Sequence, residues 1–224
     1  MLGKFRKIGR KFYDSFYCKN IKGKIEIGVQ GDPWVITENF PLKIIYSGGV
    51  GKNISFELEL IEKYNSLVYI YDPSPTGIKT INELKVKPRN LLFHPIGLNK
   101  KNEVLFFSFP KNPDEGSFYA ISSDKVKKEN VIQFECQSIS NLMKVNGHAK
   151  IDLLKIDIEG AEYGVIDDIL ENQLNIKQIC LEFHHFFQGI PRSKTKRYIK
   201  KLNANGYTLF HKVGTVYSFI KLNP

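Results

Sequence analysis

The stretch LKIIYSGGVGKNISFELELIEKYNSLVYIYD, residues 42–72, decides the fold of this chain. It opens with a short apolar run, which is typical of a buried strand, and continues into a glycine-rich turn at residues 47–51. Residues 54–64 then repeat apolar positions at helical spacing. A second continuous apolar run, 67–71, ends at Asp72. A strand, a glycine turn, a helix and a strand in this order predict the first unit of a parallel sheet.

The same alternation continues along the chain. Expected strands cover residues 42–46, 67–71, 91–93, 151–156 and 178–183, and expected helices cover 54–64, 79–86, 138–145, 193–203 and the segment around Val165 and Leu170. Apolar runs at 104–107 and 118–121 flank a turn-rich stretch and indicate an inserted hairpin or loop. The runs 207–210 and 216–220 indicate a closing hairpin. We therefore predict a doubly wound α/β fold with a mainly parallel sheet and a C-terminal antiparallel hairpin.

The length and the charge distribution suggest one domain with an extension. A chain of 224 residues suits a single core, which we assign to residues 42–224, with 1–41 as a basic extension packed on or flanking the domain. Residues 1–24 hold eight Lys or Arg and one Asp, so they carry seven of the ten net positive charges. Because the rest of the chain is only mildly basic, nucleic acid is not an expected partner.

The N-terminal segment allows two interpretations. Its apolar residues Phe5, Ile8, Phe12 and Phe16 share one face of a helix that also carries basic residues. We favour a surface helix packed on the domain over a helix lying on an anionic membrane surface. We see no membrane-spanning run and no secretory signal, and the three cysteines form no Cys-x-x-Cys pair. A cytoplasmic location is therefore expected.

Glycines and an acid follow the first two strands. Gly48, Gly49 and Gly51 come directly after the first strand, where the backbone could approach a ligand closely. Asp72 lies 21 residues beyond Gly51, at the end of the second strand, and a carboxylate there could accept the hydroxyls of a ribose. Ligands of such sheets bind beyond the carboxyl ends of the strands. These residues together predict a nucleoside site.

The details of the glycine turn narrow the choice of nucleoside. A nicotinamide site would need a third glycine where this chain has Ile54, and a phosphate-binding Walker loop would need Ser or Thr where it has Asn53. An NAD-linked oxidoreductase is therefore disfavoured. S-adenosylmethionine carries no phosphate, so it needs close glycine contact and a ribose acid but no phosphate cradle. We expect it as the cofactor.

Residues 153–163, with the core Lys-Ile-Asp-x-Glu-Gly-Ala-Glu, resemble the most characteristic stretch of the FkbM-type methyltransferases. Residues 46–51, 71–75 and 181–185 also resemble segments of that family, and the resemblance covers roughly 42–221. It implies a class I methyltransferase-like fold, S-adenosylmethionine as cofactor, and transfer of a methyl group, usually to a hydroxyl oxygen of a sugar or another small metabolite.

One departure concerns the place just before the first glycine. Many methyltransferases of this fold have an acid there, whereas this chain has Tyr46 and Ser47. Glu57 and Glu159 are the candidates to replace that acid. The predicted cofactor-binding residues are Ser47, Gly48, Gly49, Gly51, Asp72, Ser74, Gly97, Asp157 and Glu159.

Two residues are candidates for the chemistry. Asp157 ends the fourth strand and is expected to touch both cofactor and acceptor, although Asp157 and Glu159 could instead favour the start of the next helix. His184 is the first candidate for a general base, because the unperturbed pKa of histidine is near neutral. His185 ranks below it, since neighbouring residues of a strand face opposite sides.

Three alternatives remain open. Asp157, Glu159, Glu182 and His184 carry metal-ligand atoms, but their spacing matches no metal motif, so no metal site is predicted. An RNA methyltransferase could use the basic cluster Arg192, Lys194, Lys196, Arg197, Lys200 and Lys201, although such clusters are more often solvated helix faces. The third alternative is a non-catalytic cofactor-binding domain in glycan or lipid assembly. We favour a small-molecule or glycan acceptor.

Overall fold

The structure of the chain is a computed structural model that describes residues 18–29, 34–110, 116–121, 131–185 and 189–222. The expected helix over residues 5–16 lies outside these ranges, so its packing stays a prediction. Within them, no helix combines the length and the apolar character needed to cross a membrane.

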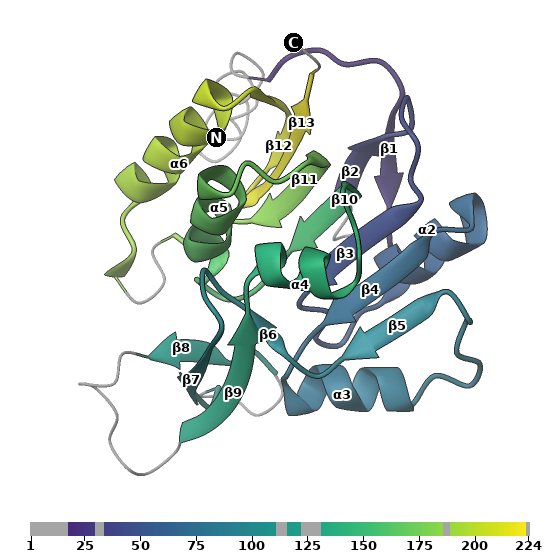
Figure 1. The fold of residues 1–224 in the computed structure, drawn as a ribbon, viewed down its shortest axis with the longest axis vertical. Coiled ribbons are helices and arrows are strands. Elements are labelled where there is room, and N and C mark those ends of the chain that lie inside the picture. Colours follow the sequence, from purple (N-terminus) through teal and green to yellow (C-terminus); the bar gives the residue numbers. More distant parts are fainter. Residues whose placement is uncertain (1–17, 30–33, 111–115, 122–130, 186–188, 223–224) are drawn as a thin grey trace, which may run out of the picture.

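A seven-stranded sheet forms the centre of the molecule, in the order β12-β13-β11-β10-β3-β4-β5 (Figure 1). Its strands are β3 (Ile44–Gly48), β4 (Leu67–Tyr71), β5 (Leu91–His94), β10 (Ile151–Ile156), β11 (Ile176–Glu182), β12 (Tyr207–Val213) and β13 (Val216–Lys221). The strands from β11 to β5 pair in parallel, whereas β13 pairs antiparallel with both β11 and β12. The predicted fold class is therefore confirmed, including the closing hairpin.

Helices cover both faces of this sheet because the strand residues alternate between two apolar cores. The helices are α2 (Ser55–Tyr64), α3 (Pro75–Asn82), α4 (Ile139–Val145), α5 (Glu162–Glu171) and α6 (Arg192–Ala204). Ile45 of β3 belongs to the core that contains Leu60 of α2, whereas its neighbour Tyr46 belongs to the core that contains Ile166 of α5. In Figure 1, α4 and α5 lie in front of the sheet.

A second, four-stranded sheet is inserted between β5 and α4. It consists of β6 (Gly97–Leu98), β7 (Glu103–Ser108), β8 (Tyr119–Ile121) and β9 (Val131–Gln137), in the order β6-β9-β7-β8. The antiparallel pair of β7 and β8 confirms the predicted hairpin. Strand β9 was not predicted from the sequence, and it pairs with both β6 and β7.

The strands β1 (Lys24–Ile27) and β2 (Trp34–Thr37) form an antiparallel pair within the segment expected to pack on or flank the domain. Ile27, Trp34 and Ile36 belong to the same core as α2. The backbone of Thr37 exchanges two 2.9 Å hydrogen bonds with the side-chain amide of Gln178 in β11. These contacts attach β1 and β2 to the rest of the domain.

One helix boundary differs from the prediction. The helix expected over 79–86 covers Pro75–Asn82 instead, as α3. Its start is set by Ser74, whose hydroxyl accepts a hydrogen bond from the Gly77 backbone, and by Pro75 in the first turn. Both features favour a helix start, so local capping places the helix four residues earlier than predicted.

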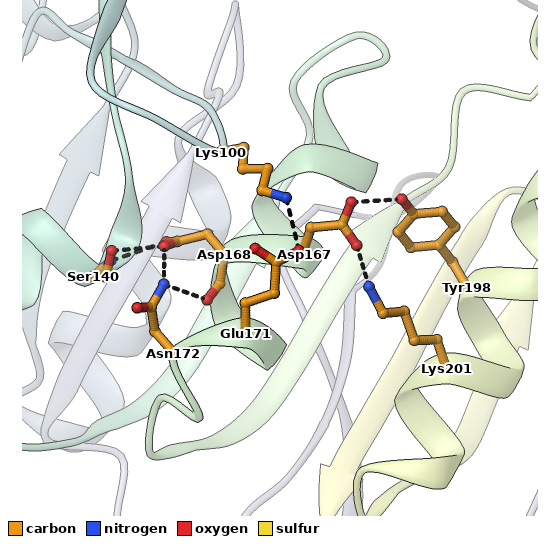
Figure 2. Close-up of polar contacts among 8 residues, drawn as sticks. All are labelled: Lys100, Ser140, Asp167, Asp168, Glu171, Asn172, Tyr198 and Lys201. Atoms are coloured by element: carbon orange, nitrogen blue, oxygen red, sulfur yellow. Dashed lines mark hydrogen bonds and ion pairs between the residues drawn. The ribbon is translucent and has the colours of Figure 1, made fainter.

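Helix α5 is bound to the neighbouring helices and to the loop before β7 by acidic side chains, as Figure 2 shows. Asp168 is buried and accepts hydrogen bonds from the backbone and the hydroxyl of Ser140 at the start of α4, at 3.0 and 2.6 Å. Asp167 accepts hydrogen bonds from Tyr198 and Lys201 of α6. Helix α5 is therefore fixed against α4 and α6, which positions the loop that precedes it.

Candidate functional site

A cavity of about 280 Å³ opens at the carboxyl ends of the parallel strands. Its walls come from the turn after β3, the segments that follow β4 and β10, and the inserted sheet. Residues along these walls include Gly49, Gly51, Asp72, Ser74, Gly97, Leu98, Phe107, Phe118, Phe134, Asp157 and Glu159. Seven of the nine predicted cofactor-binding residues thus line one cavity, whereas Ser47 and Gly48 are not part of its wall.

Gly49 is required by a close approach between two segments of backbone. A Cβ atom at this position would lie 1.8 Å from the carbonyl oxygen of Asp157, and the φ angle of Gly49 is +76°. The Asp157 backbone N–H also donates a 2.9 Å hydrogen bond to the carbonyl of Gly48. The turn after β3 is therefore held against the end of β10, so the glycine shapes the cavity whatever ligand enters it.

The carboxylate of Asp72 organises the glycine turn. It is buried and accepts hydrogen bonds from the backbone of Val50 at 2.9 Å, Gly51 at 3.0 Å and Ser74 at 2.8 Å. A carboxylate offers about four acceptor positions, so about one remains for a ligand hydroxyl. Asp72 was expected to accept both hydroxyls of a ribose. Because the backbone bonds use three positions, we now expect it to accept one.

Ser47 and Glu57 form a buried group beneath the turn. The Ser47 hydroxyl donates a hydrogen bond to Glu57, whose side chain is fully buried. The ammonium of Lys155 lies 3.7 Å from the same carboxylate and donates a 2.6 Å hydrogen bond to the carbonyl of Gly49. The structure therefore places Glu57 inside the protein, and of the two candidates to replace the missing acid only Glu159 lines the cavity.

The start of α5 bears on whether Asp157 and Glu159 cap that helix or bind a ligand. The N-cap of α5 is Ala161, which makes no side-chain capping hydrogen bond, and the acid in the first turn is Glu162. Neither Asp157 nor Glu159 therefore caps this helix. Glu159 has a φ angle of +53°, a conformation that residues other than glycine rarely adopt. Burial raises the pKa of Glu159, and nearby His184 and Ser117 partly oppose that rise.

His184 lies at the centre of an acidic cluster beside the cavity. Its Nδ1 atom is 2.6 Å from Oε1 of the fully buried Glu162, which also accepts a 2.8 Å hydrogen bond from the backbone of Gly160. On the other side of the ring, Nε2 lies 3.4 Å from Glu159 and 3.7 Å from Asp157. The sequence analysis did not assign Glu162 a role, although it is the last acid of the motif at residues 155–162.

The electrostatics of the cluster alter the predicted roles. Burial alone would lower the pKa of His184, but the hydrogen bond and charge of Glu162, together with Glu159 and Asp157, outweigh it and raise that pKa to about 9. His184 is therefore mainly protonated at neutral pH in the ligand-free protein, and the near-neutral pKa on which its role as base was predicted does not apply there. Burial raises the pKa of Asp157 to about 7, partly opposed by Lys155.

Metal-ligand atoms also converge here. One atom each from Asp157, Glu182 and His184 lies within 4.8 Å of the other two. Glu182 is the last residue of β11, and its carboxylate accepts a 2.6 Å hydrogen bond from the hydroxyl of Thr215. The linear spacing of these residues gave no metal motif, because their proximity arises from the pairing of β10 with β11.

Sequence reasoning missed the apolar wall of the cavity. Leu98, Phe107, Phe118 and Phe134 come from the inserted sheet, and the rings of Phe107 and Phe134 pack with centroids 4.9 Å apart. The run at 104–107 predicted a hairpin strand, but nothing in the sequence indicated that the hairpin would cover the ends of the parallel strands.

One protein-family model matches most of the chain. A family model described as the methyltransferase FkbM domain matches residues 25–209. A fibrillarin pre-rRNA processing protein from Methanococcus jannaschii is a structural neighbour at 12% identity and a TM-score of 0.49, with 91% of this chain and 84% of that chain covered. A search of curated proteins found no match.

Proposed function

We propose that this chain, which belongs to the FkbM methyltransferase family, transfers the methyl group of S-adenosylmethionine to a hydroxyl oxygen of a sugar, glycan or other small metabolite. The fold is class I methyltransferase-like, and the family membership supports methyl transfer in general. The observation that carries the more specific proposal is that one cavity is lined by the glycine turn, Asp72, Asp157 and Glu159.

The charge of the cavity supports S-adenosylmethionine over a phosphate-bearing nucleotide. Asp72, Asp157 and Glu159 place three carboxyl groups along its wall, against one lysine, Lys52. Such a wall attracts the sulfonium and ammonium groups of S-adenosylmethionine and repels the phosphates of a dinucleotide. The aromatic side chains Phe107, Phe118 and Phe134 offer an apolar surface of the kind that a purine ring packs against.

In the proposed reaction the residues of the chain orient the acceptor and receive a proton. When bound, S-adenosylmethionine supplies an activated sulfonium methyl group. The Asp157 carboxylate would accept the proton that the acceptor hydroxyl loses when its oxygen is methylated. With a pKa near 7, Asp157 is substantially ionised at neutral pH, as a general base must be. Alignment of the acceptor contributes further, since held reactants avoid an entropic cost.

The alternative of an RNA methyltransferase gains no support from helix α6. Two lysines of its basic cluster contact α5: Lys201 bonds to Asp167, and the Lys194 ammonium lies 4.3 Å from the ring centroid of Tyr163. Part of the cluster therefore serves packing between helices. We infer a cytoplasmic location from the cysteine spacing, and membrane contact through the basic N-terminus stays a prediction about residues outside the described ranges.

The test begins with calorimetry on the full chain, using S-adenosylmethionine and its demethylated product as ligands. A labelled-methyl screen over sugars, glycans and RNA then identifies the acceptor. Transfer of label to a hydroxyl of a sugar or small metabolite supports the proposal. Transfer to RNA would show that the acceptor is RNA and not a small molecule. Cofactor binding without transfer would indicate a non-catalytic domain. If neither S-adenosylmethionine nor its demethylated product binds, the proposal is overturned.

A further inference from the structure

Three side chains with metal-ligand atoms meet where two neighbouring strands end. Asp157 directly follows β10, Glu182 ends β11, and His184 lies two residues further along. Strands β10 and β11 pair in parallel with Ile156 opposite Leu181, so their ends lie side by side. One nitrogen and two carboxylate oxygens therefore converge from two rigid elements.

The separations within this group suit a shared cation better than direct hydrogen bonds. His184 Nε2 lies 3.7 Å from Oδ1 of Asp157 and 3.4 Å from Oε2 of Glu159. A hydrogen bond between such atoms would span about 2.7–3.2 Å. Ligands about 2.1 Å from a common metal lie roughly 3.0 Å apart in an octahedral site and roughly 3.4 Å apart in a tetrahedral one. The separation between His184 and Asp157 is within a few tenths of an ångström of the tetrahedral value. The ligand atom of Glu182 lies within 4.8 Å of both, so an approach of Glu182 toward them would complete a first coordination sphere.

The orientation of the imidazole matches that of a metal ligand. A histidine that binds a metal through one ring nitrogen usually donates the other N–H to a carboxylate. Glu162 supplies that carboxylate, 2.6 Å from Nδ1, which leaves Nε2 facing Asp157 and Glu159. Glu162 is fully buried, and its second oxygen has no hydrogen-bond partner within the part of the chain that the structure describes. The hydroxyl of Thr215 orients Glu182 in a similar way, at 2.6 Å.

We propose that Asp157, Glu182 and His184 bind one divalent cation of the class that accepts mixed imidazole and carboxylate ligands, with Glu162 orienting the histidine. Three protein ligands leave coordination positions open for a second molecule. The role of the cation rests on the proposed function: it holds the acceptor hydroxyl oxygen beside the cavity and makes that hydroxyl easier to deprotonate, while one oxygen of Asp157 binds the cation and the other accepts the proton. Binding of the cation itself does not depend on that function.

The test measures Mn²⁺ binding to the full chain, after treatment with a chelator and without cofactor, by electron paramagnetic resonance and calorimetry. We expect one Mn²⁺ per chain and binding weaker by about tenfold or more in Glu182→Gln and in His184→Gln. Glu182→Gln is the primary variant, because glutamine can still accept the hydrogen bond from Thr215. The control is Glu171→Gln, an acid on α5 that pairs with Lys100, and its affinity should equal that of the unaltered chain.

Three results would overturn the proposal. The first is the absence of specific binding of Mn²⁺, Mg²⁺ or Zn²⁺ to the unaltered chain. The second is Mn²⁺ binding that is equal in Glu182→Gln, His184→Gln and the control. The third is competition between S-adenosylmethionine and Mn²⁺, which would assign these acids to the cationic cofactor. The Mn²⁺ assay does not depend on methyl transfer. If the chain binds Mn²⁺ but not S-adenosylmethionine, only the proposed function is refuted. If it binds S-adenosylmethionine but not a divalent cation, only the cation site is refuted.

Discussion

Oε1 of Glu162 lies 2.6 Å from Nδ1 of His184, and the glutamate side chain is fully buried. This contact joins the last acid of the motif at 155–162 to the segment that follows β11. A buried carboxylate needs a compensating partner, and the imidazole provides one when it is protonated. The two residues therefore act as a pair, and neither is understood from its own position in the sequence.

The first prediction concerns the proton on His184 in chelator-treated protein. Glu162→Gln removes the charge and the strong acceptor that raise the pKa of His184 to about 9, so that pKa should fall toward the ordinary value near 6.5. Histidine ring titration by NMR measures this shift. An unchanged pKa in the variant would show that other groups hold the proton.

The same pair predicts a dependence of stability on pH. Because the pKa of His184 is higher in the folded protein than in the unfolded chain, the protonated pair stabilises the fold fully below about pH 6.5. That stabilisation is lost as the pH rises through about 9. Chemical unfolding at several pH values should show this loss in the unaltered chain and a smaller one in Glu162→Gln.

The second prediction compares two glycines of the same turn. Gly49→Ala forces a Cβ to 1.8 Å from the Asp157 carbonyl at a φ of +76°, so we expect a loss of about 3 kcal/mol or more in unfolding free energy. Gly51→Ala is the control: its φ is +48°, but a Cβ there meets nothing within 4 Å, so only about 1–2 kcal/mol should be lost. Equal losses, measured by denaturant titration, would contradict the close approach.

The third prediction separates the two roles of Asp72. Asp72→Asn replaces a carboxylate that accepts three backbone hydrogen bonds, so cofactor affinity should fall about tenfold or more as the turn loosens. If the carboxylate also touches the ribose, a 2′-deoxy or 3′-deoxy analogue should bind less well to the unaltered chain and show a smaller deficit in the variant. Calorimetry with both analogues decides this. If each analogue loses the same affinity relative to the cofactor in both proteins, Asp72 does not contact the ribose and only holds the turn.

The fourth prediction concerns turnover. His184→Asn should slow methyl transfer by about a hundredfold or more, because it removes the ring that lies 3.7 Å from Asp157, the proposed proton acceptor. Cofactor affinity should stay nearly unchanged, because His184 lies outside the cavity wall. Labelled-methyl assays and calorimetry on the same preparation give both quantities. Full turnover in the variant would remove His184 from the mechanism.

The sequence predicted those features that depend on local pattern. Strands β4 and β10 were placed at their observed residues, because both faces of a central parallel strand are buried and leave a mainly apolar signal, which Asp152 and Lys155 interrupt in β10. Glycine and acid at strand ends predicted most of one cavity wall. The contact between Glu162 and His184, the burial of Glu57 and the aromatic wall were not predictable, because each depends on how distant segments pack.

The fifth prediction concerns the support of the loop before α5, through the contacts shown in Figure 2. Asp168→Ala removes a buried carboxylate from the backbone and hydroxyl of Ser140 and from Asn172, leaving the half-buried donors of Ser140 without that acceptor. We expect a loss of about 2–4 kcal/mol in unfolding free energy. Glu171→Ala breaks an exposed pair with Lys100 on the same helix, and an exposed ion pair contributes about 0–1 kcal/mol. Denaturant unfolding of both variants measures the difference. Equal effects would mean that the start of α4 needs no acid from α5, and that the loop carrying Asp157 and Glu159 is held by the sheet alone.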